Sequence, residues 1–396
     1  MELRLDVAKW RKRRGTARLL RALGADEGLT RYVGGAVRDD LLRLPVSDID
    51  LATRIPPDEV VLRLEKAKIK AVPTGIDHGT ITAVSAGHPF EITTLRRDVS
   101  TDGRRATVAF TDDWKEDAAR RDFTINALSA DPVTGEIFDY FDGLGDLQQR
   151  HIRFIGDPLQ RIAEDHLRIL RFFRFHARFG SGKLDPAALE ACTARANDLM
   201  ALSRERITDE LLKLLAVDDP TPTVDTMLQR AILAPVLPEI ELKRLPDLQA
   251  LIASEREAGI DPDPLRRLAA LLPSDPAVAD DIGARLRLSN KARKRLVCDA
   301  GMEPYASAEA LAYRLGTECA VDRLLLDRRA DDAKAVARWK TPRLPIAGGA
   351  LIKRGLPEGP IVAKTLRQIE DEWVKAGFPT GGDFERIVSE ALARTR

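Results

Sequence analysis

The sequence changes character along its length, and this change restricts the fold more than any other feature. Between about residues 30 and 140, short runs rich in β-branched residues alternate with turn residues, and 80–85 with 90–95 is the clearest predicted hairpin. From about residue 157 almost to the end, Leu, Ala, Arg and Glu follow a helical pattern that Pro and Gly interrupt. We therefore predict an α+β protein in which a small α/β head precedes a long helical remainder.

Length and composition suit a multidomain globular chain. The 396 residues are enough for roughly two to four domains, and 44% hydrophobic with 32% charged residues allows sizeable cores. No apolar run approaches the ~18 residues of a membrane span, and the charged N-terminus does not resemble a secretory signal. The three cysteines are far apart and odd in number, which argues against a disulfide framework or a zinc cluster. We therefore predict inert, buried thiols in a cytoplasmic protein that has no membrane partner and no evident obligate protein partner.

The net charge of +1 hides an uneven distribution of basic residues. Residues 150–178 contain seven arginines and three acids, and residues 285–295 contain six basic residues and no acid. Such stretches are typical of surfaces that contact the phosphates of a structured RNA. A solvated helical face explains the stretch 285–295 equally well, so both interpretations stay open.

A glycine pair after the first predicted strand indicates an anion-binding turn. Gly34 and Gly35 follow the strand-like residues 31–33, and a helical stretch comes next. Without a Cβ the backbone can approach a ligand closely, and the N–H groups at the start of the helix point toward the same place. Arg38, in the first turn of that helix, adds a charge-assisted contact to phosphate oxygens. We predict that Gly35 and Arg38 bind a triphosphate.

Two aspartates behind this turn predict a metal site. Asp48 and Asp50 are two residues apart on a predicted strand, so their side chains face the same side. Adjacent carboxylates repel each other unless a cation neutralises them, and Mg²⁺ with phosphate ligands fits such a pair. Glu91, in the predicted hairpin, is a candidate third carboxylate. A solvated strand edge would explain a lone Asp-x-Asp, but it explains the ordered combination with the glycine pair and helix much less well.

The segment 157–179 predicts one long helix with Asp157 as its cap and Pro158 in its first turn. Asp165 and Arg168 lie about one turn apart on a face separate from the apolar stripe. A carboxylate accepts and a guanidinium donates hydrogen bonds, so the pair matches the amino group and ring nitrogen of cytosine or adenine. Uracil and guanine would leave both groups unpaired, which predicts that the protein itself selects C and A. The alternative is an ordinary surface ion pair.

Several short segments, taken together, resemble the class II tRNA nucleotidyltransferases, which are the CCA-adding enzymes, and their relatives the bacterial poly(A) polymerases. The segments are 34–39 with 48–50, 78–80, 90–96, 120–127 and 164–168. A patch at 344–360 is similar to the family's tail, but it has Ala350 where an aspartate is usual.

This resemblance implies a palm-like nucleotidyltransferase head with a mixed sheet, followed by an extended all-α neck, body and tail. The expected divisions are a head at 1–140, a neck at 141–205 with the nucleotide-selecting segment, a body at 206–280 and a tRNA-binding tail at 281–396. The polar segment 97–112 is expected to form a mobile surface loop. In the family this loop is needed to switch from adding C to adding A, so its presence favours complete CCA addition.

The implied reaction is template-independent addition or repair of the 3′-terminal CCA of tRNA. It uses CTP and ATP, depends on Mg²⁺ and releases pyrophosphate. The expected catalytic residues are Asp48, Asp50 and Glu91, of which Asp48 and Asp50 bind the metal. The expected nucleotide-binding residues are Gly35, Arg38, Arg121, Asp165, Arg168, Arg171 and Arg174, and for Arg121, Arg171 and Arg174 this role rests on the resemblance.

Three alternatives stay open at this point. A poly(A) polymerase would perform the same chemistry with a different stopping rule, although the segment 78–80 is unlike the corresponding polymerase stretch. An enzyme that adds only CC or only A would carry the same residues. A non-catalytic RNA-binding module is disfavoured, because every expected carboxylate is present.

Overall fold

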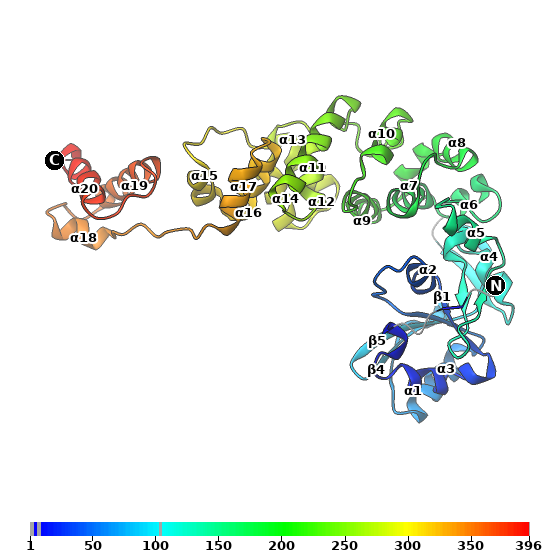
Figure 1. Cartoon of the computed structure of the whole chain (residues 1–396). Helices are drawn as coiled ribbons and strands as arrows, with labels where there is room; N and C mark the ends of the chain where they lie inside the picture. Colours follow the sequence, from blue (N-terminus) through cyan, green and yellow to red (C-terminus); the bar gives the residue numbers. More distant parts are fainter. Residues whose placement is uncertain (1–3, 6–8, 103–104, 396) are drawn as a thin grey trace. The chain divides into compact units, whose positions relative to one another are not determined.

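The computed structural model describes residues 4–5, 9–102 and 105–395, and they form two compact units. Unit 1 comprises Met1–Ser203 with Arg230–Pro235, and unit 2 comprises Arg204–Gln229 with Val236–Arg396. All the strands that the structure describes belong to unit 1, and unit 2 is built from helices (Figure 1). The predicted α+β class is therefore confirmed, while the division into head, neck, body and tail stays a prediction.

Unit 1 is built on a seven-stranded mixed sheet in the order β3-β4-β5-β2-β1-β8-β9. Its strands are β1 (Thr30–Val33), β2 (Asp50–Thr53), β3 (Lys70–Gly75), β4 (Thr80–Ser85), β5 (His88–Thr94), β8 (Ser129–Ala130) and β9 (Ile137–Phe138). The strands β2 and β5 run parallel, and the other neighbouring pairs are antiparallel. The predicted hairpin is confirmed as β4 and β5, and the parallel pairing places Asp50 opposite Glu91.

A second hairpin corrects the expectation for segment 97–112. The strands β6 (Arg96–Asp102) and β7 (Arg105–Phe110) pair as a separate two-stranded antiparallel sheet, where we expected a mobile loop. Residues 103–104 lie outside the described residues. The β7 segment contains Thr and Val, which favour strands, but the polar residues around them hid this pattern in the sequence.

Helices cover the sheet and extend unit 1 beyond it (Figure 1). They are α1 (Thr16–Ala22), α2 (Gly35–Leu41), α3 (Pro57–Lys66), α4 (Trp114–Ala119), α5 (Gly143–Gln148), α6 (Pro158–Glu164), α7 (Arg168–Phe179) and α8 (Pro186–Ala194). Short 3-10 helices lie at Lys9–Lys12, Ala25–Glu27, Ile76–His78, Thr124–Asn126 and Ala196–Ala201. The helix α3 buries Val60 and Leu64, which lie one turn apart, against the sheet, where β4 buries the alternating residues Ile81 and Ala83.

The predicted single helix at 157–179 is wrong, because the structure has two helices there. The first, α6, ends at Glu164, and Asp165 adopts an extended backbone with φ −152° and ψ 106°. The Asp165 carboxylate accepts a hydrogen bond from the Leu167 backbone N–H at 3.1 Å, and its carbonyl accepts one from the Arg168 N–H at 3.0 Å. A side chain that binds the backbone two residues on competes with helix formation, and this explains the break.

Unit 2 consists of packed helices, and no helix in the described part of the chain is long and apolar enough to cross a membrane. Its helices are α9 (Arg204–Leu215), α10 (Thr221–Gln229), α11 (Leu245–Ala258), α12 (Pro264–Leu271), α13 (Pro276–Arg285), α14 (Asn290–Asp299), α15 (Ala308–Leu315), α16 (Thr317–Leu326), α17 (Ala330–Arg338), α18 (Gly348–Lys353), α19 (Pro360–Lys375) and α20 (Gly382–Thr395), with a 3-10 helix at Leu242–Arg244. One core lies among α11, α15, α16 and α17, and a second lies around Trp373 of α19.

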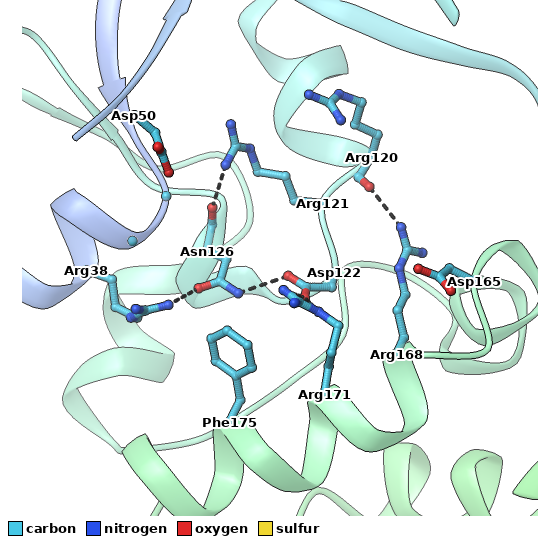
Figure 2. Close-up of a pocket in the computed structure, with 12 residues that line it drawn as sticks. Arg38, Asp50, Arg120, Arg121, Asp122, Asn126, Asp165, Arg168, Arg171 and Phe175 are labelled. Atoms are coloured by element: carbon cyan, nitrogen blue, oxygen red, sulfur yellow. Dashed lines mark hydrogen bonds and ion pairs between the residues drawn. The ribbon is translucent and has the colours of Figure 1, made fainter. Parts of the chain in front are cut away.

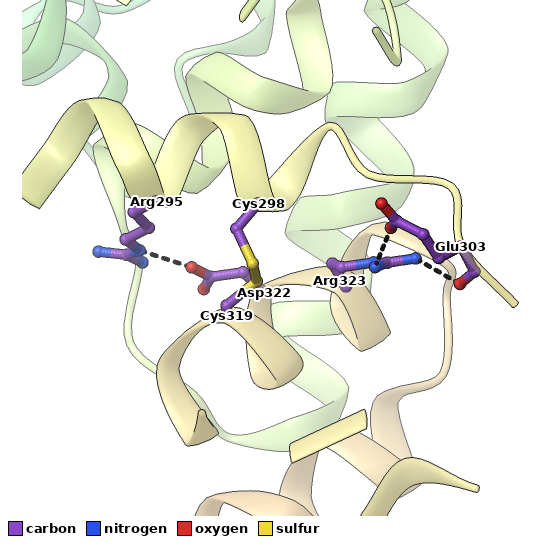
Figure 3. Close-up of a disulfide and its surroundings, with 6 residues drawn as sticks. All are labelled: Arg295, Cys298, Glu303, Cys319, Asp322 and Arg323. Carbon is purple, nitrogen blue, oxygen red and sulfur yellow. Dashed lines mark hydrogen bonds and ion pairs between the residues drawn. A yellow bond between two sulfur atoms is a disulfide. The ribbon is translucent and has the colours of Figure 1, made fainter. Parts of the chain in front are cut away.

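The cysteines correct a second expectation. Cys298 of α14 and Cys319 of α16 form a disulfide, where we expected inert thiols (Figure 3). Their Cα atoms are 6.2 Å apart because α14 packs against α16, a tertiary contact that cysteine spacing alone does not reveal. Cys192 is buried and free, as predicted, and burial raises the pKa of its thiol.

The basic stretch 285–295 is largely paired within unit 2. Five of its six basic side chains form ion pairs with acids from other segments of that unit. Arg285 contacts Glu239 at 2.6 Å, and Arg295 contacts Asp322 at 2.6 Å and Asp263 at 3.0 Å. The stretch therefore carries less net positive charge than its sequence suggests.

Candidate active site

The glycine pair forms the turn between β1 and α2. Gly34 has φ 65°, a conformation that glycine adopts readily, and a Cβ at this position would lie 2.9 Å from Nη1 of Arg121. Gly35 begins α2, and a Cβ there would make only an ordinary contact with Arg38. The close approach that we predicted for the pair is therefore required at Gly34, whereas Gly35 was the residue that we expected to bind the nucleotide.

The three candidate carboxylates lie near one another at the edge of this turn. Asp50 is the first residue of β2, while Asp48 precedes the strand and is exposed, contrary to the expectation that both lie on one strand. Burial raises the pKa of Asp50 to about 6, and the charges of Glu91 and Asp48 contribute in the same direction. The positive charge of Arg121 acts in the opposite direction.

This carboxylate group fits a divalent cation. Mutual repulsion among acids that remain close together is relieved by a hard cation with oxygen ligands. In the described part of the chain no three acidic, histidine or cysteine side chains are gathered closely enough to form a complete metal site. Asp50 and Glu91, which are opposite each other in β2 and β5, are compatible with a hard divalent cation that takes one or two carboxylates from a protein and its other ligands from phosphates and water.

A cavity of about 380 Å³ in unit 1 brings most of the predicted residues together (Figure 2). It is lined by Gly34, Gly35, Arg38, Asp50, Arg120, Arg121, Asp122, Asn126, Asp165, Arg168, Arg171 and Phe175. Five arginines face three carboxylates in this lining, so the cavity suits a polyanionic ligand such as a triphosphate. Asp48 and Glu91 are not among the lining residues, nor is Arg174, whose guanidinium lies 4.4 Å over the Phe175 ring.

A chain of hydrogen bonds runs along the cavity from α2 to α7. Arg38 donates to the side-chain oxygen of Asn126, whose amide donates to Asp122 at 2.9 Å. Arg171 of α7 donates to the other oxygen of Asp122 at 2.7 Å. Although burial acts to raise the pKa of Asp122, Arg171 and these hydrogen bonds lower it overall, so Asp122 is a carboxylate at neutral pH.

The cavity also contains Arg120, Asp122, Asn126 and Phe175, which were not among the expected nucleotide-binding residues. Asp122 and Asn126 are four residues apart in the sequence, and their side chains form a hydrogen bond. Here α4 ends at Ala119 and a 3-10 helix covers Thr124–Asn126, so the contact arises without a continuous helix. For Arg120, Asp122 and Asn126 the signal is their place in segment 120–127, where polar side chains that form hydrogen bonds lie beside Arg121, while Phe175 belongs to α7.

Asp165 and Arg168 both line the cavity but do not form the predicted helical pair. Arg168 donates to Glu164 at 2.6 Å and to the backbone oxygens of Arg161 at 2.9 Å and Arg120 at 3.1 Å. Asp165 lies in the break between the two helices, as Figure 2 shows, and belongs to the same wall of the cavity. The surface ion pair that we kept as the alternative is not observed between these two residues.

Comparison with known proteins places this arrangement in a defined class. Residues 30–153 match the family described as the poly A polymerase head domain, and residues 183–243 match the probable RNA and SrmB-binding site of polymerase A. The head of unit 1 is thus similar to the nucleotidyltransferase head of the poly A polymerase family.

Relatives over most of the chain define the family more closely. The chain is 35% identical to the mitochondrial CCA tRNA nucleotidyltransferase 1 of Mus musculus over 370 residues, which is 88% of this chain and 83% of that protein. It is 32% identical to the CCA-adding enzyme of Lacticaseibacillus paracasei, with 88% of each chain covered. The chain therefore belongs to the family of CCA-adding tRNA nucleotidyltransferases.

Solved structures agree with this assignment. The CCA-adding enzyme of Bacillus stearothermophilus in complex with CTP matches with a TM-score of 0.73 and 25% identity, covering 96% of this chain and 98% of that one. The Thermotoga maritima CCA-adding enzyme complexed with tRNA also has a TM-score of 0.73, with 100% of both chains covered. The sequences of these two chains are 22% identical, so this comparison supports a shared fold.

Proposed function

We propose that this chain adds or repairs the 3′-terminal CCA of tRNA, using CTP and ATP and releasing pyrophosphate. The observation that carries the proposal is the cavity of unit 1, where the glycine turn, Asp50, five further charged residues from segments 120–127 and 164–168, and Arg171 converge. Relatives over most of the chain are CCA-adding enzymes, and solved neighbours include complexes with CTP, ATP and tRNA. A nucleotide and the end of an RNA are therefore the ligands that we assign.

The triphosphate would occupy the part of the cavity next to the glycine turn. The backbone at Gly34 and Gly35 allows close approach there, and Arg121 lies against Gly34. Arg38 lines the same region, although its ion pair with Asp39 at 2.6 Å and its stacking on Phe179 hold it firmly. Arg38 therefore acts as a preorganised positive charge that needs no rearrangement when phosphate arrives.

The metal would be Mg²⁺, held by Asp48 and Asp50 with Glu91 as a supporting carboxylate. When bound, it would supply positive charge for the attack of the RNA 3′-hydroxyl and for departure of pyrophosphate. The protein's own contribution is to keep the carboxylates close together on one side of the cavity, with Asp50 and Glu91 fixed by the parallel pairing of β2 and β5.

Base selection would fall to Asp165 and Arg168 on the cavity wall. The Asp165 carboxylate would accept from the exocyclic amino group, and Arg168 would donate to the neighbouring ring nitrogen of cytosine or adenine. Uracil and guanine present a carbonyl and an N–H at these positions and would leave both groups unpaired. We assign further nucleotide contacts to Arg171, which lines the cavity, and to Arg174, three residues further along α7.

We place the reaction in the cytoplasm, where tRNA, CTP and ATP occur together. The mouse relative is mitochondrial, so the compartment is a separate question from the chemistry. Fractionation of the source cells with an antibody against the chain answers it: recovery with cytosolic markers supports our assignment, and recovery with an organelle contradicts it.

The direct test is extension of a tRNA transcript that ends at the discriminator base. Purified protein receives Mg²⁺ with CTP and ATP, separately and together, and the 3′ ends are sequenced. Addition of CCA followed by a stop supports the proposal. Addition of CC or A alone makes the protein a specialised enzyme, a long adenosine tail makes it a poly(A) polymerase, and bound but unextended RNA makes it a binding module.

Asp50→Asn is the matched variant for this assay. It keeps the shape of the side chain but removes its charge, so we expect extension to fall at least about a thousandfold. Circular dichroism should match that of the wild type, because Asp50 lies at the cavity and not in a core. Appreciable extension by this variant would contradict the metal assignment.

A further inference from the structure

Asp117 of α4 lies behind the arginine pair of the cavity and contacts both of its members. Its side chain is 5% exposed, and Oδ1 accepts hydrogen bonds from Nε of Arg120 at 2.9 Å and from the backbone N–H of Arg96 at 3.3 Å. Its other oxygen, Oδ2, lies 3.5 Å from Nη2 of Arg121. Asp117 does not line the cavity, so any effect that it has on a ligand must pass through the residues that it holds.

Arg121 lies within the influence of two carboxylates. One is Asp117 behind it, and the other is Asp50 across the cavity, whose charge also acts on the guanidinium. Nη1 of Arg121 also donates a hydrogen bond to the backbone oxygen of Asn126 at 3.3 Å, which fixes the other end of the guanidinium, as Figure 2 shows. The lack of a side chain at Gly34 leaves the space that this end occupies.

A closer cation would stabilise the charged form of the Asp50 carboxylate. It is partly buried beside Glu91 and Asp48, and these surroundings work against its charged form. Arginine pairs readily with a carboxylate in such a setting through charge-assisted hydrogen bonds. A bound Arg121 would occupy the oxygens that a metal ion needs, so the two cations would compete for Asp50.

We propose that Asp117 is a positioning residue that holds Arg121 away from Asp50 and so keeps Asp50 available to the divalent cation. This inference rests on the proposed function, because it concerns the metal of the same site. The contacts of Asp117 to Arg120 and to the start of β6 fix the carboxylate on two elements of the scaffold, so that it can hold a second arginine in place.

The consequence is that Asp117 affects metal binding through Arg121 and through no other route. Asp117→Asn keeps the size of the side chain and the hydrogen bond from the Arg96 N–H, but removes the charge that attracts Arg121. Arg121 then pairs with Asp50, and the affinity for the cation falls. Asp117→Glu restores a carboxylate and should recover most of the affinity.

The test measures binding of Mn²⁺ alone to the full chain by electron paramagnetic resonance, without nucleotide or RNA. We expect Asp117→Asn to weaken Mn²⁺ binding about tenfold, and Asp117→Glu to remain within about threefold of wild type. Arg121→Met should bind Mn²⁺ at least as tightly as wild type. Adding Asp117→Asn to Arg121→Met should then cause no further change in Mn²⁺ affinity, because Arg121→Met has already removed the competing cation.

Asp146→Asn is the matched control. Asp146 is also a buried carboxylate of unit 1 paired with an arginine, Arg153 at 3.0 Å, but it does not line the cavity. Its loss should leave Mn²⁺ affinity unchanged, whereas a general loosening of unit 1 would lower affinity in both variants. Thermal unfolding of each variant shows whether it is folded.

Two results would overturn the inference. One is wild-type affinity in Asp117→Asn. The other is an equal loss of affinity when Asp117→Asn is made in the wild-type and Arg121→Met backgrounds, which would show that Arg121 is not the route. The proposed function fails separately, if the wild-type chain does not extend tRNA in the presence of Mg²⁺.

Discussion

Both units place arginine and carboxylate side chains in close contact, but the network of unit 1 is open to a cavity and that of unit 2 is closed. In unit 1, Arg120, Arg121 and Arg171 are held by Asp117 and Asp122 from behind and keep part of their surface toward the cavity. The carboxylates there orient the arginines without covering them. Such a network is prepared to bind a further anion.

In unit 2 the arginine and carboxylate side chains pair with one another in the interior of the unit. Arg267 is 1% exposed and donates to Glu255 at 2.9 Å and to the backbone oxygens of Leu215, Val217 and Asp218. Arg266 beside it lies 3.3 Å from Glu255 and 3.5 Å from Asp322. These contacts connect helices within the unit, and the side chains of Arg266 and Arg267 are 3% and 1% exposed, so the network has little surface open to a ligand.

The difference shows that arginine–carboxylate pairing by itself says little about function. What separates the two regions is whether a polar face remains open after the pairs have formed. Changes in the closed network should alter stability and leave nucleotide binding intact. Changes in the open network should weaken nucleotide binding and leave stability intact.

The largest effect on stability is expected for Arg267→Met. The change leaves Glu255 and several backbone oxygens of unit 2 without their donor, and breaking a buried ion pair in this way costs about 3–5 kcal/mol. Hydrogen exchange of peptides from α11 and α12 measures the loss locally, while CTP binding by equilibrium dialysis should be unchanged. Loss of CTP binding with normal exchange would contradict the comparison.

Arg256→Met is the control for that variant. Arg256 is also on α11, and it pairs with Asp218 at 3.2 Å, but both side chains are more than half exposed. An exposed pair contributes about 0–1 kcal/mol, so hydrogen exchange should hardly change.

A smaller loss of stability is expected on reduction of the disulfide. Cys298 and Cys319 are 21 residues apart, and opening a loop of that length lowers the free energy of unfolding by about 3 kcal/mol. Denaturant titrations with and without dithiothreitol measure the difference, and Cys298→Ser should be insensitive to the reductant. Titration of three free thiols in the unreduced, unfolded chain would show that the bond had not formed.

An effect that depends on pH concerns Asp299, at the end of α14. It is buried, and in the described part of the chain neither of its carboxylate oxygens has a hydrogen-bond partner. Burial raises its pKa, the charges of Asp322 and Asp263 act in the same direction, and Arg295 and Arg266 oppose them. The folded chain therefore keeps a proton that the unfolded chain releases above about pH 4, so stability falls as the pH rises.

Asp299→Asn removes this titration. The variant should equal the wild type near pH 4 and become the more stable of the two as the pH rises toward the raised pKa, with the difference growing by at most about 1.4 kcal/mol per pH unit. Thermal unfolding of both proteins at pH 5, 7 and 8 measures the trend. A difference that stays constant with pH would contradict it.

Local patterns in the sequence predicted much of unit 1. The glycine turn and the hairpin 80–85 with 90–95 follow from residue types and spacing over a few positions, and the structure has both. The proximity of Asp50 and Glu91 was also expected, and the parallel pairing of β2 and β5 provides it. The glycine turn and the hairpin are fixed by short-range backbone preferences, which a sequence displays directly, whereas the approach of β2 to β5 is a long-range pairing.

The remaining features depend on competition or on tertiary contacts. The break at Asp165 arises because its side chain binds the backbone more favourably than the helix does, and the surrounding helical pattern conceals this. The disulfide depends on the packing of α14 against α16, and the role of Asp117 depends on contacts with two arginines and the start of β6. Spacing along the chain contains no signal for such contacts.

We propose that Asp165, on the wall of the unit 1 cavity, selects the base, and single-turnover incorporation of CTP and UTP onto a tRNA transcript tests this role most directly. We predict that Asp165→Ala lowers the ratio of CTP to UTP incorporation about a hundredfold while tRNA binding persists, because the amino group of cytosine loses its acceptor. Asp157→Ala, which alters an exposed cap at the start of α6, should leave the ratio unchanged. An unchanged ratio in Asp165→Ala would contradict the account.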